Sequence, residues 1–437
     1  MRQRGIPQVP LRRIPGQLCR EWRPLVQGFS VPTVLSMRIR DVSRPRLGIV
    51  VDSRKHILIT FGRSFLTLNL ARLMSAAGHR VTTVDSIPLT LSRVSHAVDA
   101  FHLVPPPKFE PQAYCRELAR IATDEAVDMV IPIHEETDIL SMMRGLFPPE
   151  CELFLSDFEL ENQLHNKFDF QVMLAERGIP TLKFARLDGP EDIPNLDFDG
   201  PFAVKKCYSR GSQKVHKVYP GDPMTWLDHD PANPWLAQQW LTGDRYCTYS
   251  VVRDGKINAH ATYPVEYAIG GSSCLSFRPT HHQAIFDWVS DFLASTNFTG
   301  QVGFDFIDDG EKGLYCIECN PRATSGIMMF RPHNRVDQAF FGTSTSLIVP
   351  DDDVRAMIKL GMALYGWRED ARQGRSVKQY FRDLRDYDDV IAKRDDRKPG
   401  VALPVAYLGI LRSCVKYRVG LAEGFMHDHE WDGQVIS

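Results

Sequence analysis

Two carboxylates and an amide that could share one metal ion stand on two neighbouring segments of this sequence. Residues 300–322 read as two strands joined by a turn rich in Asp and Gly. Glu318 and Asn320 share one face of the second strand because side chains repeat every two residues, and Asp305 can lie opposite them. Hard oxygen ligands suit Mg²⁺, and Arg322 just beyond them could neutralise a phosphoryl oxygen. A hairpin with a polar, solvent-facing side is the alternative.

The same strand carries Cys316 and Cys319, which formally match the spacing of a zinc motif. On a regular strand these two thiols point to opposite faces, with Cys316 on the face of Glu318 and with Ile317 turned inward. The sequence has no second pair of cysteines at this spacing. We therefore do not expect a zinc site.

A second group of residues could bind phosphate. Residues 201–205 form an apolar strand that ends in Lys205, and the loop that follows contains Ser209, Gly211 and Ser212. The amides of such a loop can donate to phosphate oxygens while the lysine adds positive charge. A solvated basic edge is the alternative.

These segments need a scaffold, and the first part of it reads as an α/β lobe. Apolar strands alternate with segments whose apolar residues repeat at helical spacing. The strands are expected at residues 56–61, 80–84 and 127–133, and the helices at residues 65–77 and 111–125. This order predicts a parallel, doubly wound sheet.

One feature of this lobe resembles part of a dinucleotide site. Asp85 lies 23 residues after Gly62, close to where a ribose-binding carboxylate would stand. The second and third glycines of a dinucleotide loop are missing, so we favour a structural lobe whose loops face a cleft. The acidic cluster Glu135–Asp138 follows a strand, where α/β proteins bind ligands, and a solvated acidic loop fits it equally well.

The chain after residue 160 differs from this lobe. Residues 235–262 contain short apolar strands and an Asp254-Gly255 hairpin turn, which predict antiparallel pairing. The C-terminal part is expected to be mainly helical, at residues 354–367, 377–384 and 407–425. We expect residues 406–422 to form a docking helix or a dimer face rather than a membrane anchor, because three cationic residues interrupt the apolar pattern.

The composition is that of an ordinary globular protein of 437 residues, with 43% hydrophobic and 24% charged residues. A net charge of −2 gives no general attraction to nucleic acid or to an anionic membrane. Nine cysteines, an odd number, are not typical of a secreted disulfide framework, so we expect a cytoplasmic protein. Residues 1–50 hold ten arginines and two acidic residues and read as a disordered tail. A transit peptide and a true start at Met37 are alternatives.

The order of the motifs resembles the ATP-grasp superfamily, in particular the branch of carbamoyl-phosphate synthetase, biotin carboxylase and the carboxylate–amine ligases. The resemblance runs from residue 56 to residue 335. Its most specific part is Glu318-Cys319-Asn320-Pro321-Arg322. The supporting motifs are Asn166-Lys167, Gly178-Ile179-Pro180, Ala203-Val204-Lys205, Gln239-Trp240-Leu241-Thr242-Gly243 and Gly303-Phe304-Asp305-Phe306.

The resemblance implies an α/β then α+β architecture. A Rossmann-like pre-ATP-grasp domain spans residues 51–160, and an ATP-grasp domain spans residues 161–345. The latter has a lid at about residues 180–243 and a metal-binding antiparallel-sheet subdomain. A mainly helical extension spans residues 346–437.

The resemblance also implies roles for individual residues. The nucleotide is assigned to Lys167, Lys205, Ser209, Gly211, Ser212, Gln239 and Leu241. The Mg²⁺ ligands are Asp305, Glu318 and Asn320, with Mn²⁺ as an alternative ion. Arg322 and Lys205 are the catalytic residues. The family usually binds ribose with a glutamate after the hinge, and here Asp244 stands near that position. Substrate contacts are assigned to Arg278, Glu266 and Ser325.

The activity implied is that of a carboxylate–amine ligase that uses ATP, forms an acyl-phosphate and releases ADP and phosphate. Other ATP-grasp chemistry, by a kinase or a carboxyphosphate-forming enzyme, and a non-catalytic ATP-binding regulator are the alternatives. The expected partners are a small carboxylate and a small amine, without nucleic acid or membrane, and a homodimer is left open.

Overall fold

The computed structural model describes residues 54–210, 215–269, 273–366, 376–434 and 436. All of these residues belong to one compact unit that begins at Val51. The predicted tail and the predicted site residues Gly211 and Ser212 lie outside the described residues.

The N-terminal lobe is built on a parallel sheet with the strand order β3-β2-β1-β4-β5. Its strands are β1 (His56–Ile59), β2 (Arg80–Asp85), β3 (Ala100–Leu103), β4 (Met129–Ile131) and β5 (Glu152–Leu153). Its helices are α1 (Phe65–Ala76), α2 (Leu91–Val94), α3 (Pro111–Asp124) and α4 (Glu136–Met142). The predicted parallel pairing of β1, β2 and β4 is confirmed, whereas β3 and β5 were not predicted.

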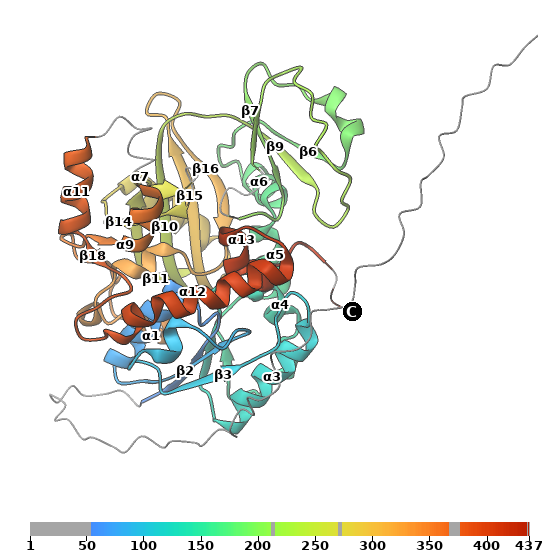
Figure 1. Ribbon diagram of the computed structural model, residues 1–437. Coiled ribbons are helices and arrows are strands. Elements are labelled where there is room, and N and C mark those ends of the chain that lie inside the picture. The colour runs from blue at the N-terminus through green and yellow to red at the C-terminus, as the bar shows by residue number, and fades with distance from the viewer. Residues whose placement is uncertain (1–53, 211–214, 270–272, 367–375, 435, 437) are drawn as a thin grey trace, which may run out of the picture. The chain divides into compact units, whose positions relative to one another are not determined.

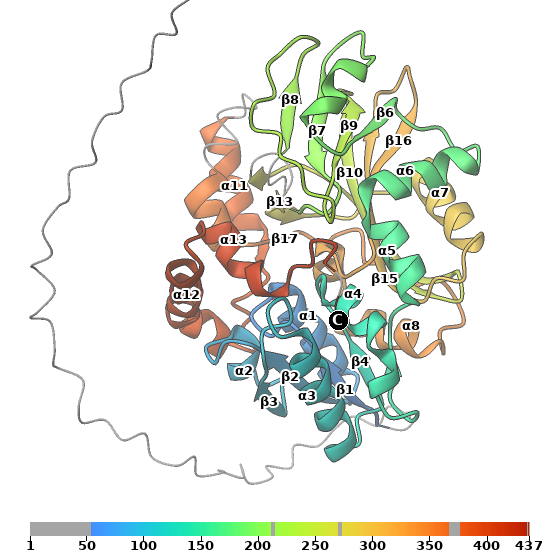
Figure 2. The same cartoon turned by 90° about the vertical axis from the view of Figure 1, so that its right-hand side faces the viewer.

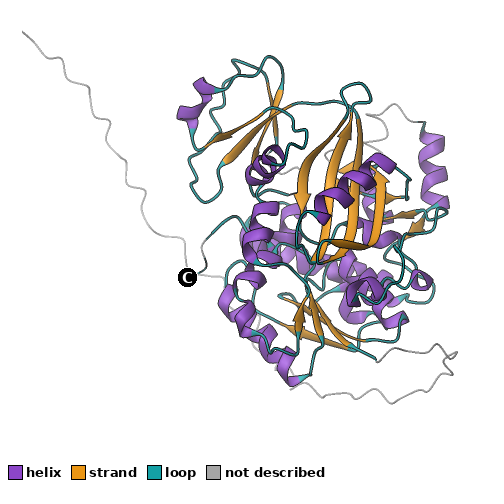
Figure 3. Ribbon diagram, turned by 180° about the vertical axis from the view of Figure 1, so that it is seen from behind, coloured by secondary structure: helices purple, strands orange, loops and turns teal. Residues whose placement is uncertain are grey.

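Two antiparallel sheets follow, and Figure 3 shows them as groups of strands separate from the parallel sheet. The first has the order β6-β9-β7-β8, with β6 (Phe184–Leu187), β7 (Phe202–Lys206), β8 (His216–Val218) and β9 (Trp235–Gln239). The second has the order β11-β10-β15-β16, with β10 (Asp244–Arg253), β11 (Lys256–Pro264), β15 (Gly300–Asp308) and β16 (Leu314–Asn320).

Aromatic packing fixes β15 from one side. Phe304 and Phe306 of this strand contact Trp288 and Phe292 of α7 (Gln283–Ala294), with 5.1 Å between the ring centroids of Trp288 and Phe306. Because side chains alternate along a strand, Asp305 between the two phenylalanines is directed to the opposite face.

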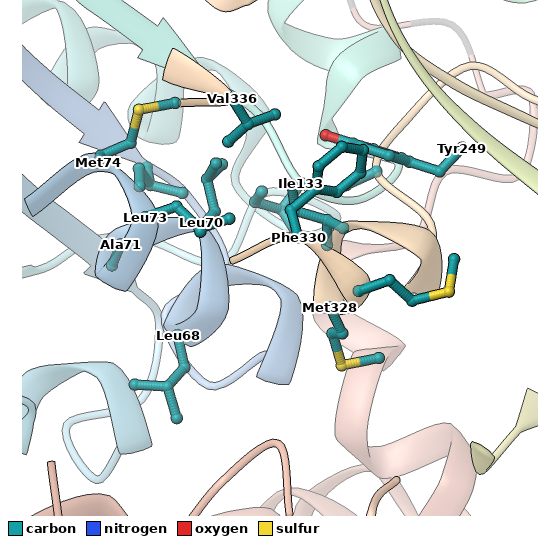
Figure 4. Packing of buried hydrophobic residues seen from close by; sticks show 14 of the residues in the cluster. Leu68, Leu70, Ala71, Leu73, Met74, Ile133, Tyr249, Met328, Phe330 and Val336 are labelled. Carbon is teal, nitrogen blue, oxygen red and sulfur yellow. The ribbon is translucent and has the colours of Figure 1, made fainter. Parts of the chain in front are cut away.

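An apolar cluster joins α1 to the second antiparallel sheet (Figure 4). Leu70 and Leu73 of α1 belong to it, together with Tyr249 of β10 and with Met328 and Phe330 at the 3₁₀ helix Ser325–Met329. This packing holds the chain after Arg322 against the N-terminal lobe.

Helices α12 (Lys398–Tyr417) and α13 (Leu421–Met426) lie beside the N-terminal lobe, as Figures 1 and 2 show in red and blue. Helix α11 (Val377–Asp386) lies apart from this lobe, and its Tyr380 packs in one cluster with Tyr267, Leu275 and Met357. The prediction of one helix over residues 407–425 is wrong, because Arg418 has a left-handed φ of 58° that ends α12. The prediction of a helix over residues 354–367 is also wrong at its start. There β17 (Ala356–Met357) is extended and pairs with β14 (Ser276–Phe277).

One face of α12 is apolar and exposed. Its side chains are Val401, Val405, Leu408, Leu411 and Val415. A docking helix or dimer face therefore stays a prediction, and this exposed apolar face of α12 is the surface it would use. Within the described ranges, no helix combines the length and the apolar character that crossing a membrane requires.

Candidate active site

The hairpin of β15 and β16 brings two carboxylates face to face. Asp305 pairs directly with Glu318 in the strand register, but Phe306 pairs with Cys316, so Ile317 is an extra residue. This bulge overturns the expected alternation along β16. Cys316 turns into the same buried cluster as Cys319, and Ile317 lines the cavity beside Glu318.

Two lysines approach these carboxylates. The Nζ of Lys167, the first residue of α6 (Lys167–Glu176), lies 3.7 Å from Oε1 of Glu318. Lys205 of β7 donates to the carbonyl of Ile317 at 3.3 Å. Burial lowers the pKa of Lys205 to about 8, and the nearby Lys167 also lowers it. Burial raises the pKa of Asp305 to about 6, and the charge of Glu318 adds to this effect.

The donor set fits a divalent cation. The described residues contain no group of three or more His, Cys, Asp or Glu side chains arranged around a metal position. The set here consists of two carboxylates and the amide of Asn320, whose Oδ1 accepts a bond from Arg322 at 2.9 Å. The pKa shifts of Lys205 and Asp305 reflect the cost of burying charges that lack sufficient opposite charge nearby. A metal ion and phosphate groups would supply that charge.

One cavity of about 530 Å³ collects most of the predicted residues. Its lining includes Lys205, Ser209, Gln239, Leu241, Asp305, Glu318, Asn320, Arg322 and Ser325. Lys167 reaches this group through Glu318 and donates to the carbonyl of Ser209 at 2.5 Å.

The end of β9 supplies an apolar wall of the cavity. Leu241 is buried and packs in one small cluster with Leu182 and Ile307. Gln238 is buried, and its Nε2 has no hydrogen-bond partner in the described part of the chain. The Oε1 of Gln239, by contrast, accepts from the backbone of Lys183 at 3.4 Å. A flat heteroaromatic ring suits this combination of an apolar wall and an unpaired amide.

Besides Lys167, three predicted residues do not line the cavity. Asp244 is exposed at the start of β10, opposite Asp308. Arg278 and Glu266 form an ion pair with each other at 2.7 Å, so the arginine already has an anionic partner. The roles in ribose and substrate binding that were assigned to these residues stay predictions.

Other lining residues were not predicted. Arg210, Lys217 and Arg245 add positive charge, and Lys217 lies 4.7 Å from the ring centroid of Trp240. The basic character of the sequence around the loop between β7 and β8 could have indicated Arg210 and Lys217. Leu66 comes from α1 of the N-terminal lobe, and no local pattern indicates its place in the cavity.

Asp85, the carboxylate that the dinucleotide alternative would use to bind ribose, is already paired with an arginine. Asp85 is fully buried and accepts bonds from the backbone N–H of Arg63 at 2.7 Å, from its Nε at 3.0 Å and from its Nη2 at 2.5 Å. A ribose cannot use this carboxylate without breaking a buried ion pair. This arrangement excludes Asp85 from the role that the dinucleotide alternative gave it.

No protein-family model matches the sequence, and no curated protein matches it. Solved structures do resemble it. N5-carboxyaminoimidazole synthetase from Staphylococcus aureus complexed with ADP matches with a TM-score of 0.55 at 13% identity, over 73% of this chain and 86% of that chain. L-amino acid ligase from Bacillus licheniformis matches with a TM-score of 0.50 at 14% identity, over 62% of this chain and 69% of that chain. Pyruvate carboxylase from Rhizobium etli matches with a TM-score of 0.52 at 14% identity, over 69% of this chain and 30% of that chain.

Proposed function

We propose that this chain, which has the ATP-grasp fold, is an ATP-dependent ligase that joins a carboxylate to an amine. It would form an acyl-phosphate and release ADP and phosphate. The observation that carries the proposal is the single cavity in which Asp305 and Glu318 lie near Lys205 and Arg322, with Lys167 beside Glu318. The structural neighbours include an ADP complex and an amino acid ligase, which supports this choice.

The nucleotide would lie along the cavity from Leu241 to Arg322. The adenine ring would pack on the apolar wall, where the Nε2 of Gln238 can donate to it. Lys167 and Lys205 would bind phosphate oxygens, and each such charge-assisted hydrogen bond contributes about 1.5–3 kcal/mol.

Asp305, Glu318 and Asn320 would hold Mg²⁺, with Mn²⁺ as the alternative ion. When bound, the ion supplies positive charge that offsets the charge of the phosphate oxygens. The other roles in the reaction belong to side chains of this protein.

Two steps complete the reaction. A carboxylate oxygen of the substrate attacks the γ-phosphorus, and the bond from that phosphorus to ADP breaks. The amine then attacks the acyl carbon, phosphate leaves, and the amine nitrogen loses a proton. Arg322, whose Nε has no partner among the described residues, can donate to the transferred phosphoryl group. Exclusion of water protects the acyl-phosphate from hydrolysis.

The proposal is tested by ADP release from the purified protein with Mg²⁺ and ATP, screened against pools of small carboxylates and amines. We expect ADP only with a particular acid and amine together. ADP with the acid alone would favour a kinase, AMP in place of ADP would contradict the acyl-phosphate route, and tight nucleotide binding without turnover would favour a regulator.

Two variants link the activity to this cavity. Glu318→Gln removes a proposed metal ligand, and Lys205→Ala removes a phosphate contact. We expect each variant to fold and to lose ATP turnover, and wild-type turnover in either folded variant would contradict the assignment. The homodimer stays a prediction.

A further inference from the structure

The C-terminal segment, residues 427–434, lies at the carboxyl edge of the parallel sheet. Asp428 pairs with Arg63, just after β1, at 2.9 Å. The carbonyl of His429 is 3.3 Å from Nδ1 of His134, just after β4. In the order β3-β2-β1-β4-β5, β1 and β4 flank the switch point at which α/β sheets bind ligands. The chain's own C-terminal segment therefore occupies that place.

The same segment holds Arg210, which lines the cavity. The guanidinium of Arg210 is buried and lies 3.1 Å from Glu430 and 3.0 Å from Asp432. It also donates to the carbonyl of Trp431 at 3.0 Å. Its fourth partner is Glu135 of the predicted acidic cluster, at 2.6 Å. The acidic cluster is thus buried rather than a solvated loop, and its Glu135 belongs to this network.

A ring contact holds the chain on the other side of Ser209. The indole of Trp431 is buried and packs edge-on against Tyr208, with 5.0 Å between the ring centroids. Gly433 has a φ of 84°, and a Cβ there would lie 2.2 Å from the carbonyl of Ala232 and 2.7 Å from the Tyr208 ring. Only glycine allows the segment to lie this close.

We propose that the C-terminal segment is a positioning element of the nucleotide site, with Glu430, Trp431 and Asp432 as positioning residues. They clamp Tyr208 and Arg210 and so fix Ser209 between them. The carbonyl of Ser209 accepts the bond from Lys167 Nζ, so the clamp also orients one of the two proposed phosphate lysines. This inference rests on the proposed function.

The experiment compares two charge changes within the same segment. Glu430→Gln with Asp432→Asn removes both negative charges that the segment gives to Arg210 and keeps the shape of the side chains. Asp428→Asn is the matched control, because Asp428 pairs with Arg63, which does not line the cavity. The probe is ADP with Mg²⁺, and its Kd is measured by calorimetry on full-length protein at a temperature where every variant is folded.

We expect the double variant to raise the Kd for ADP about tenfold, within the usual range for coupling between two sites. Asp428→Asn should change the Kd by less than about twofold, although it lowers stability. In an Arg210→Gln background the double variant should add no further loss, because the path through Arg210 is already broken.

Each other outcome decides between the two proposals. Unchanged Kd values for ADP in the double variant, with tight binding by the wild type, would overturn the positioning role and leave the proposed function standing. An equal loss in Asp428→Asn would overturn the positioning role of the contacts to Arg210, because Asp428 pairs with Arg63 instead. Absence of ADP binding by the wild type would overturn the proposed function itself. If the double variant does not fold, Asp432→Asn alone and Trp431→Phe carry the same comparison.

Discussion

His165 is expected to make the stability of this protein depend on pH in the alkaline range. It is the last residue of α5 (Phe158–His165), and its side chain is only 5% exposed. Its Nδ1 lies 2.9 Å from Asp138 and its Nε2 lies 3.6 Å from Glu135. Burial alone would lower its pKa, but the two carboxylates outweigh burial and raise the pKa from 6.5 to about 9.

The sign and size of the effect follow from this shift. A histidine whose pKa is higher in the folded than in the unfolded state stabilises the fold fully below its unfolded pKa. That contribution is lost as the pH rises from 6.5 through about 9. At about 1.36 kcal/mol per pKa unit, the loss amounts to about 3 kcal/mol.

The assay is urea unfolding of the wild type and of His165→Gln at several pH values from 6 to 10. We expect the wild type to lose about 3 kcal/mol more unfolding free energy than the variant across this range. The difference between the two proteins is the quantity to follow, because lysines, tyrosines and cysteines titrate in both of them.

His134 provides the control, since it is buried at the same edge of the sheet. Burial lowers its pKa to about 3, and the nearby Arg322 adds to this effect. Its cost therefore appears only as the pH falls below 6.5, and His134→Gln should leave the alkaline slope unchanged. A constant difference between wild type and His165→Gln from pH 6 to pH 10 would refute the reasoning.

Three further outcomes are expected. Arg63→Met leaves the buried Asp85 and Asp428 without their cation and should lower the unfolding free energy by about 3–5 kcal/mol in urea, whereas Arg120→Met on an exposed helix face should lower it far less. Phe304→Ala should cost about 3–5 kcal/mol in the same assay, because its ring is fully buried among the aromatic residues of α7, and a smaller loss would mean that the cluster repacks. Chelation by EDTA should stop ADP formation and added Mg²⁺ should restore it, and continued turnover in EDTA would contradict the proposed metal site.

The sequence predicted those features of the site that depend on neighbouring residues. Period-two alternation and the Asp/Gly turn placed Asp305 opposite Glu318, and the register shows them as direct partners. The sequence also predicted the strand that ends in Lys205 and the apolar position of Leu241, because each of these features depends on a few adjacent residues. All four lie on the same cavity.

The parts that failed depend on distant residues or on irregular geometry. The bulge at Ile317 inserts one residue into β16 and turns the side chain of Cys316 to the opposite face of the strand. No rule of residue spacing predicts such a bulge. Arg63 and Asp428 are 365 positions apart, so neither residue could reveal that the other neutralises it. Residues 354–357 have helical character by composition but pair with β14, because tertiary contact overrides weak propensity.

The buried charges of this chain divide into two kinds, and the division separates scaffold from site. Arg210 has three carboxylates within 3.1 Å, and Lys108 and His165 also pair with members of this set, so the counter-charges of the network come from the chain itself. Around Asp305 the opposite holds, because burial raises the pKa of this carboxyl and lowers that of Lys205, and both groups are pushed towards their neutral forms. A protein keeps such groups at a cost in stability only where something else completes the charge. The second cluster is therefore the one at which we propose that a metal and phosphate groups bind, and the first belongs to the frame beside it.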